Sequence, residues 1–214
     1  MENLSDLEIL DVSKSLTNKE TAQQILSNFE PLLRTKIGSF NGIVKQTGLD
    51  FTSMALLPSE FKEWVPLITP GDGNCLYNSV SIALVGDITV ASLLRMLTAA
   101  ELFAHSEFYA KHPQLEKFAT TARYTLPSIV AIFLSHTKAE NAFSGNLNNL
   151  PKAIEILAQE TAKPYVYSSP FNIFALSSVI GQPIFSVYPD EPSALSMKLA
   201  THGFCYPRTA LLQV

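Results

Sequence analysis

The stretch 70–79, PGDGNCLYNS, contains the residues of this chain best suited to chemistry. Four turn-forming residues, 71–74, precede Cys75, and the apolar run after it has helical spacing. A thiol at a helix N-terminus lies near unpaired amides and the positive end of the helix dipole, which favour the thiolate. Successive amides of such a loop can also form a concavity that suits an oxyanion. Cys75 is therefore a candidate nucleophile, and the loop is a candidate oxyanion site.

Cys75 also has a plain structural explanation. A cysteine beside an apolar helix is often an inert core residue, and Asp-Gly and Gly-Asn pairs are common in ordinary turns. Both explanations stay open on the residues alone, because no base is assigned to the thiol.

Residues 72–79, DGNCLYNS, and the helical pattern after them resemble the nucleophile motif of the ovarian tumour (OTU) family of cysteine peptidases, most of which are deubiquitinases. The resemblance implies that Cys75 attacks the carbonyl that follows the C-terminus of ubiquitin or a ubiquitin-like modifier. It also implies that Asp72 is the loop aspartate, and that Gly73 and Asn74 form part of the oxyanion loop. It implies no cofactor.

Two features depart from the family pattern. The third residue after Cys75 is Asn78, where the family commonly has arginine. The family's base is a late histidine followed by an aromatic residue, and this chain has no such pair. His202 is late enough to serve as the base, but it precedes Gly203.

The other three histidines have structural explanations. His105 and His112 lie on or just after a helix predicted over 92–112, where we expect a solvated helix face. His136 follows a predicted helix end, where it would meet the negative end of the helix dipole. No histidine and cysteine spacing typical of a metal site occurs, so we expect no bound metal.

The later part of the chain resembles vertnin and a group of related OTU-like animal proteins. The resemblance lies in ARYT at 122–125, ALSSV at 175–179, SVYP at 186–189 and YPR at 206–208. In the OTU-like members of this group, a further segment carries His-Phe-Val, whereas this chain stops at Val214. The resemblance therefore implies an OTU-like domain truncated before the family's histidine.

Helices dominate the predicted elements. Residues 17–33 predict an amphipathic helix with Ala22, Ile25 and Phe29 on one face, and Pro31 is expected to disturb its end. Further helices are predicted at 75–85, 92–112, 128–136, 150–162 and 170–180. The last has the clearest boundaries, because a serine cap and a proline open it and a glycine follows it.

Residues 184–188, IFSVY, predict one buried strand. Helices with a core strand indicate an α+β class, a three-layer α/β/α-like OTU fold with helices around a small central sheet, incomplete at its C-terminus. Residues 1–64 are predicted to be a partly helical extension, and 65–214 the OTU-like domain. A strand without neighbours exposes its edge, so we expect either low stability or an edge covered by residues 1–65.

Composition excludes several classes of protein. The 214 residues are 47% hydrophobic, enough for one sizeable core. A net charge of -4 and no basic run argue against nucleic-acid binding. No apolar run reaches the roughly 18–20 residues that span a membrane, and the acidic start does not resemble a secretory signal. With only two cysteines and no disulfide framework, we expect an intracellular protein, cytoplasmic or nuclear.

Two functions remain. The first is a cysteine-dependent hydrolase that removes ubiquitin or ubiquitin-like modifiers from proteins, inactive if no histidine serves Cys75. The alternative is a catalytically dead OTU-like module that binds ubiquitin or has a vertnin-like interaction role. Ubiquitin or ubiquitin-like conjugates are the expected partners in the first case.

Overall fold

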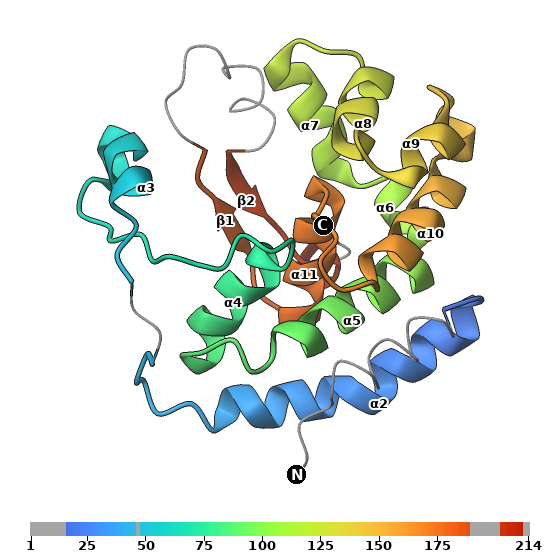
Figure 1. The fold of residues 1–214 in the computed structure, drawn as a ribbon. Coiled ribbons are helices and arrows are strands. Elements are labelled where there is room, and N and C mark those ends of the chain that lie inside the picture. Colours follow the sequence, from blue (N-terminus) through green and yellow to red (C-terminus); the bar gives the residue numbers. More distant parts are fainter. Residues whose placement is uncertain (1–15, 46–47, 189–201, 212–214) are drawn as a thin grey trace.

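The computed structural model describes residues 16–45, 48–188 and 202–211 (Figure 1). Most of these residues are helical, and two short strands pair as a sheet, which confirms the predicted α+β class. The described elements are α2 Lys19–Gly38, α3 Phe51–Leu56, η1 Ser59–Phe61, α4 Cys75–Val85, α5 Ala91–Ala104, α6 Ser106–Ala110, α7 Pro113–Ala122, α8 Leu126–Leu134, α9 Lys138–Phe143, η2 Leu147–Asn149, α10 Leu150–Thr161, α11 Pro170–Ile180, β1 Ile184–Ser186, β2 Gly203–Cys205 and α13 Arg208–Leu211.

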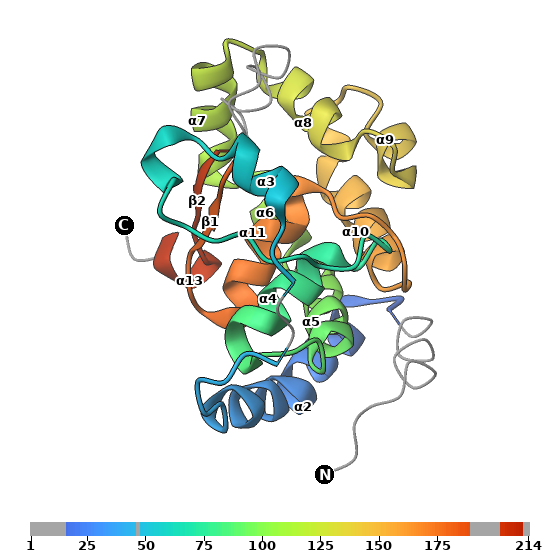
Figure 2. The ribbon, with the colours of Figure 1, turned by 60° about the vertical axis from the view of Figure 1, so that its left-hand side comes forward.

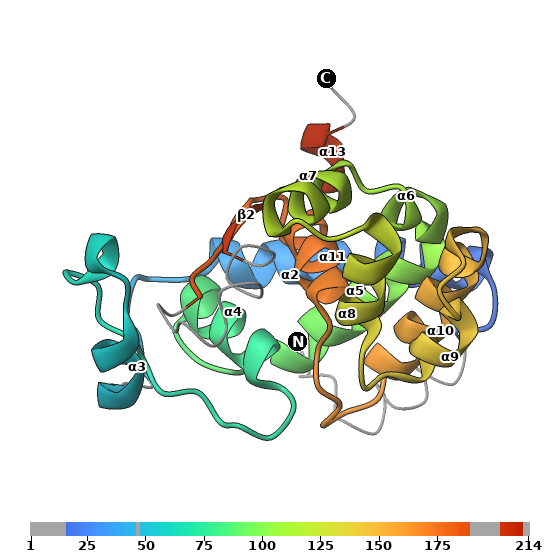
Figure 3. The ribbon, with the colours of Figure 1, turned by 90° about the horizontal axis from the view of Figure 1, so that it is seen from above.

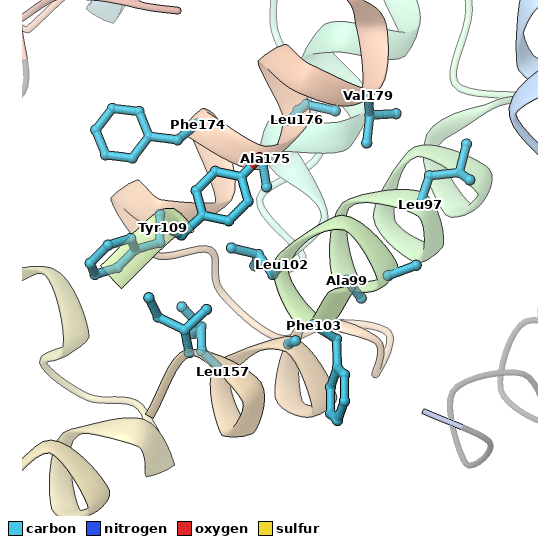
Figure 4. Close-up of a cluster of buried hydrophobic side chains, with 14 of the residues drawn as sticks. Leu97, Ala99, Leu102, Phe103, Tyr109, Leu157, Phe174, Ala175, Leu176 and Val179 are labelled. Carbon is cyan, nitrogen blue, oxygen red and sulfur yellow. The ribbon is translucent and has the colours of Figure 1, made fainter. Parts of the chain in front are cut away.

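Helix α5 lies at the centre of the core. Its sequence, ASLLRMLTAAELFA, is apolar around almost the whole helix, and such a helix needs partners on every side. Helices α2, α4, α10 and α11 supply those partners. Figure 4 shows Leu97 and Leu102 of α5 packed with Leu157 of α10 and with Leu176 and Val179 of α11. The segment that carries Cys75 is thus attached to the most deeply buried helix.

Helix α2 packs along α5 at the base of the molecule (Figure 2). It contains Pro31 and continues to Gly38, so the expectation that Pro31 disturbs the end of this helix is wrong. Two contacts made after the proline explain this result. Leu33 is fully buried, and Arg34 donates to the carbonyl oxygens of Val179 and Ile180 at 2.9 and 2.7 Å. The division of the chain at 64/65 stays a prediction, although α2 shares the core.

The predicted long helix over 92–112 is broken. Helix α5 ends at Ala104, His105 leaves the helical conformation with φ −119° and ψ 30°, and α6 begins in a new direction. The break turns His112 inward, where it is 1% exposed. The expectation of a solvated helix face is therefore wrong for His112, and His105 is itself partly buried.

The predicted helices at 128–136 and 150–162 are confirmed as α8 and α10 with small shifts of their ends, and the one at 170–180 as α11 with identical bounds. No helix was predicted from the sequence over the ranges of α7 and α9. Ser169 opens α11 with a complete capping box, in which its hydroxyl accepts the amide of Phe171 and its own amide donates to Asn172.

The predicted strand exists as β1, and it has a partner. β1 pairs antiparallel with β2, with Phe185 opposite Phe204. The expectation of a strand without neighbours is therefore wrong. On the other side of the strand, the ring of Phe61 packs against that of Phe185, with 5.5 Å between the centroids. A residue from the first 65 thus covers part of this small sheet.

Residues 48–68 lie at one side of the molecule, with α3 set apart from the helical core (Figure 3). Several large apolar side chains in this stretch are exposed, among them Phe51 at 71% and Trp64 at 56%. No helix in the described ranges is long and apolar enough to cross a membrane.

Candidate functional site

Cys75 is the first residue of α4 and is half-buried. The predicted helix from 75 to 85 is confirmed, and Gly86 ends it with φ +83°. At this glycine a Cβ would collide with the carbonyl oxygen of Ile43, so both the backbone conformation and the space require glycine. The thiol therefore occupies the helix start that the sequence predicts.

The loop before Cys75 is closed by Asp72. Its carboxylate accepts the backbone amide of Asn74 at 2.9 Å and the side-chain amide of the same residue at 3.3 Å. The bond to the backbone amide is the main cause that lowers the pKa of Asp72, so this side chain is ionised at neutral pH. That bond also occupies one of the loop amides expected to face an oxyanion.

Gly73 sits at the closest approach between this loop and the segment before α11. It has φ +84°, and a Cβ at this position would collide with the carbonyl oxygen of Tyr165. The side-chain oxygen of Asn74 accepts the amide of Tyr165 at 3.4 Å. The cysteine loop and residues 163–166 are therefore packed as one unit.

Arg95 connects the cysteine loop to residues 163–166 through hydrogen bonds from the core. Its side chain, on the buried helix α5, donates to the carbonyl oxygens of Gly73 at 2.6 Å and Val166 at 3.0 Å. It also donates to those of Thr161 and Lys163. Its guanidinium lies 4.4 Å from the centre of the Tyr77 ring, a cation–π distance. One side chain thus joins the cysteine loop, the end of α10 and the segment that follows it.

The surroundings of Arg95 act on its pKa in opposite directions. Burial lowers the pKa of Arg95, and the neighbouring Tyr77, Asp72 and Cys75 oppose that shift. The guanidinium nevertheless stays protonated, because an arginine titrates far above neutral pH. A fixed positive charge therefore lies within electrostatic reach of the Cys75 side chain.

Tyr77, two residues after the cysteine, also anchors α4 in the core. It is fully buried, and its hydroxyl accepts the side-chain amide of Asn172 at 3.2 Å. The same amide group donates to the hydroxyl of Thr161 at 2.7 Å. Burial raises the pKa of Tyr77, so the hydroxyl stays neutral. The start of α4 is thereby connected to α10 and α11.

His202 and His136 contact groups other than Cys75. His202 accepts the amide of Tyr188 at its Nδ1, at 3.1 Å, and its ring packs near Phe61 and Phe185. His136 follows the end of α8 and has φ +65°, and its amide donates to Glu140. Among the residues that the structure describes, no hydrogen bond connects a histidine ring to Cys75.

His105 and His112 belong to a different part of the molecule. His105 Nε2 lies 3.0 Å from the Arg208 guanidinium, and burial lowers the pKa of this histidine. His112 stacks on Phe174 with centroids 4.2 Å apart, and its Nδ1 accepts the amide of Gln114. Burial lowers the pKa of His112 to about 4, so its ring is neutral at pH 7.

Cys205 provides an internal contrast to Cys75. It lies in β2 at 5% exposure, and burial raises the pKa of its thiol to about 12. A buried protonated thiol is a poor nucleophile. Cys75 is thus the reactive candidate of the two. No group of three or more histidine, cysteine and acidic side chains that could hold a metal occurs in the described ranges.

Sequence reasoning missed Arg95, Asn172 and Tyr165. The sequence did contain a signal for Arg95, which is a single basic residue inside a run of apolar residues. Such a position predicts a buried charge, and a buried charge must find partners. The other two carried no comparable signal, since an asparagine and a tyrosine near a loop are common.

The part of the chain that contains Cys75 matches a known family model. The model described as "Vertnin, OTU domain" matches residues 66–213. The chain belongs to the vertnin OTU-domain family. Its mostly helical α+β architecture agrees with an OTU-like fold, and this OTU kinship connects the chain to a family that includes deubiquitinases.

Curated relatives agree with the family match. Vertnin of Bos taurus is 28% identical over 175 residues, which cover 78% of this chain and 24% of that protein. Vertnin of Homo sapiens is 26% identical over 175 residues, which cover 78% of this chain and 23% of that protein. The chain thus spans about a quarter of the length of these relatives. The comparison with solved structures gives no significant match.

Proposed function

We propose that this OTU domain is a cysteine-dependent hydrolase that removes ubiquitin or ubiquitin-like modifiers from proteins in the cytoplasm or nucleus. Cys75 attacks the carbonyl of the bond after the modifier's C-terminus and forms a thioester, the amine leaves with the proton of the thiol, and water then hydrolyses the thioester to release the modifier and restore Cys75. Asp72 shapes the oxyanion loop, to which Gly73 and Asn74 belong, and amides of this loop and of the helix start hold the oxyanion. The proposal needs no cofactor.

One observation carries this proposal: the half-buried Cys75 at the start of α4, behind a loop that Arg95 clamps from the core. Rigid placement of a nucleophile and its amide donors is what acyl-transfer chemistry requires, because donors that need not reorganise stabilise the oxyanion best. An inert core cysteine would not need this arrangement.

A second candidate function is a non-catalytic module that binds ubiquitin. The engagement of His202 with Tyr188 and with two aromatic rings favours it, because a general base must be able to reach the thiol. In this case the loop would serve recognition alone. The intact Asp-Gly-Asn-Cys sequence argues against it.

A ubiquitin probe that ends in an electrophile tests the hydrolase. We expect the purified chain to form a covalent adduct, and peptide mass spectrometry should place it at Cys75. The Cys75→Ala variant is the negative control, and Cys205→Ala should react like the parent chain because Cys205 is buried. A folded parent chain that forms no adduct would contradict the hydrolase.

Iodoacetamide separates a failed active site from an inaccessible thiol. This small reagent needs no substrate binding, so Cys75 should alkylate well before Cys205 in the native protein. Alkylation of Cys75 without labelling by the ubiquitin probe would favour the binding module. Equal protection of both cysteines would contradict the assignment of Cys75 as a nucleophile.

The base is tested by substituting the partly exposed His202 and the exposed His136. If His202 takes the thiol proton, His202→Ala should slow probe labelling by at least about 100-fold, the scale of a lost general base. His136→Ala is the matched control and should leave the rate unchanged. Equal rates for both variants would remove His202 from the mechanism.

A further inference from the structure

Tyr165 combines three properties that are rarely found together. It has φ +62°, a left-handed conformation that non-glycine residues seldom adopt. Its side chain is aromatic and yet 63% exposed. It also lies directly against the cysteine loop, through its amide and its carbonyl group. A position selected for stability alone would favour glycine or asparagine here.

The candidate site itself holds Tyr165 in this conformation. Asn74 accepts the amide of Tyr165, and Arg95 binds the carbonyl oxygens of Lys163, two residues before Tyr165, and Val166, directly after it. A residue in a sparsely populated conformation persists only where its surroundings determine it, and such residues cluster at functional sites. The contacts that fix the nucleophile loop therefore also present the Tyr165 ring to solvent.

Tyr165 contributes to the lining of two hollows. The first has a volume of about 180 Å³ and is lined by Asp72, Asn74, Asn78 and Arg95 among others. The second, of about 530 Å³, is lined by His136, Glu160 and Tyr167 among others. The first hollow is smaller than the roughly 300–1,000 Å³ of small-molecule sites, so it suits a short piece of chain.

The lining of the first hollow suits peptide groups. Asn74, the residue before α4, and Asn78, which is 4% exposed in the first turn of this helix, both line the first hollow. A side-chain amide both donates and accepts hydrogen bonds, as a peptide group does. An exposed tyrosine beside them adds a rigid apolar surface with little loss of entropy on binding.

We infer that Tyr165 positions the substrate: its exposed ring packs against the extended main chain of the modifier beside the cysteine loop. This inference rests on the proposed function and names the recognition element of the same site. Tyr165 acts in binding and takes no part in the chemical step.

Binding of unmodified ubiquitin to the Cys75→Ala chain, measured by calorimetry, tests this inference without catalysis. Tyr165→Gly should raise the dissociation constant about tenfold, the effect of losing one aromatic anchor. Tyr165→Phe keeps the ring and should stay within about twofold of the parent. Ser144→Gly is the matched control, because Ser144 also has a positive φ, of 46°, and does not line either hollow.

Thermal unfolding distinguishes recognition from a structural role. Because glycine relieves the left-handed strain, Tyr165→Gly should unfold at or above the midpoint of the parent chain, and Tyr165→Asn should behave similarly. Unchanged ubiquitin binding by Tyr165→Gly would overturn the inference. A large fall in the midpoint of both variants would also overturn it, because the ring would then be structural.

The outcome also separates this inference from the proposed function. Probe labelling of the parent chain together with unchanged binding by Tyr165→Gly would contradict the role of Tyr165 and leave the proposed hydrolase supported. Weakened binding by Tyr165→Gly in a chain that the probe does not label would sink the hydrolase and keep the recognition role. A Cys75→Ala chain that does not bind ubiquitin overturns the role of Tyr165.

Discussion

Two arginines hold two ends of this domain in different ways. Arg95 fastens the cysteine loop through bonds to backbone carbonyl oxygens alone. Arg208 fastens the C-terminal segment through the carboxylate of Glu101, at 2.8 Å, with His105 beside it. Carbonyl groups do not titrate, whereas carboxylates and histidines do. The bonds of Arg95 to the candidate site are therefore insensitive to acid, whereas the bonds of Arg208 to the C-terminal segment are sensitive to it.

The region around Arg208 contains further polar contacts that link it to the core. Tyr109 donates to Glu101 or Ser178 at 2.9 Å, and the amide of Arg208 donates to Ser178 at 2.9 Å. Gln114 binds both the carbonyl of Phe204 and the amide of Tyr206, next to the buried His112. The C-terminal segment thus depends on several side-chain partners, while a single buried cation connects the cysteine loop to the core.

The largest expected effect is the removal of Arg95. Arg95→Met keeps much of the volume but leaves four carbonyl oxygens without this donor, so we expect a loss of about 4 kcal/mol in the free energy of unfolding. Urea unfolding measures it. Arg34→Met is the matched control, because Arg34 binds two carbonyl oxygens near the surface and should cost about 1 kcal/mol. Equal losses would refute the special role of Arg95.

The second-largest expected effect is a loss of folding stability in acid, caused by His112. His112 has a pKa of about 4 in the folded protein, below its ordinary 6.5, so the unfolded chain binds this proton more readily. The stabilising effect is complete above about pH 6.5 and is lost as the pH falls to 4, by roughly 3 kcal/mol. Urea unfolding from pH 7 to 4 should show this slope in the parent chain.

The His112→Gln variant isolates that effect. It should be less stable at pH 7 and show a correspondingly shallower pH dependence, since the carboxylates are shared with the parent chain. Iodoacetamide labelling of Cys75 in native protein at pH 7 should stay unchanged in this variant. Identical slopes for the two chains would contradict the proton linkage at His112.

A smaller effect is expected at Gly73. Gly73→Ala combines a left-handed φ with a collision against the Tyr165 carbonyl, and we expect it to cost about 2 kcal/mol. Gly145→Ala is the matched control, because Gly145 has a similar φ of +75° and open space around it. Chemical denaturation should show a larger loss for Gly73→Ala. A loss no greater than that of Gly145→Ala would mean that the loop is free to move away from Tyr165.

The smallest effect is expected at Arg208. Its side chain is 22% exposed, and Glu101 keeps the Tyr109 hydroxyl as a partner, so Arg208→Gln should cost about 1 kcal/mol at pH 7. Lys152→Gln, at an exposed ion pair with Glu155, should cost nearly nothing. An Arg208→Gln loss as large as that of Arg95→Met would remove the contrast between the two anchors.

The local signals of the sequence located much of the site. The turn residues before Cys75, the helical spacing after it and Gly86 determine α4, because each acts within a few residues. The cap, proline and glycine around 170–180 determine α11 in the same way. The OTU resemblance of residues 72–79 and the family match to 66–213 agree on the fold.

Long-range contacts decided the rest, because their energy appears only when distant segments meet. The break at His105, which buries His112, gains its stability from the packing of α6 against α10. The bonds of Arg95 join residues 73, 161, 163 and 166, and the left-handed Tyr165 depends on them. The sequence by itself determined a cysteine at a helix start behind a tight loop. Only the tertiary structure decided what clamps that loop and which side chain stands beside it.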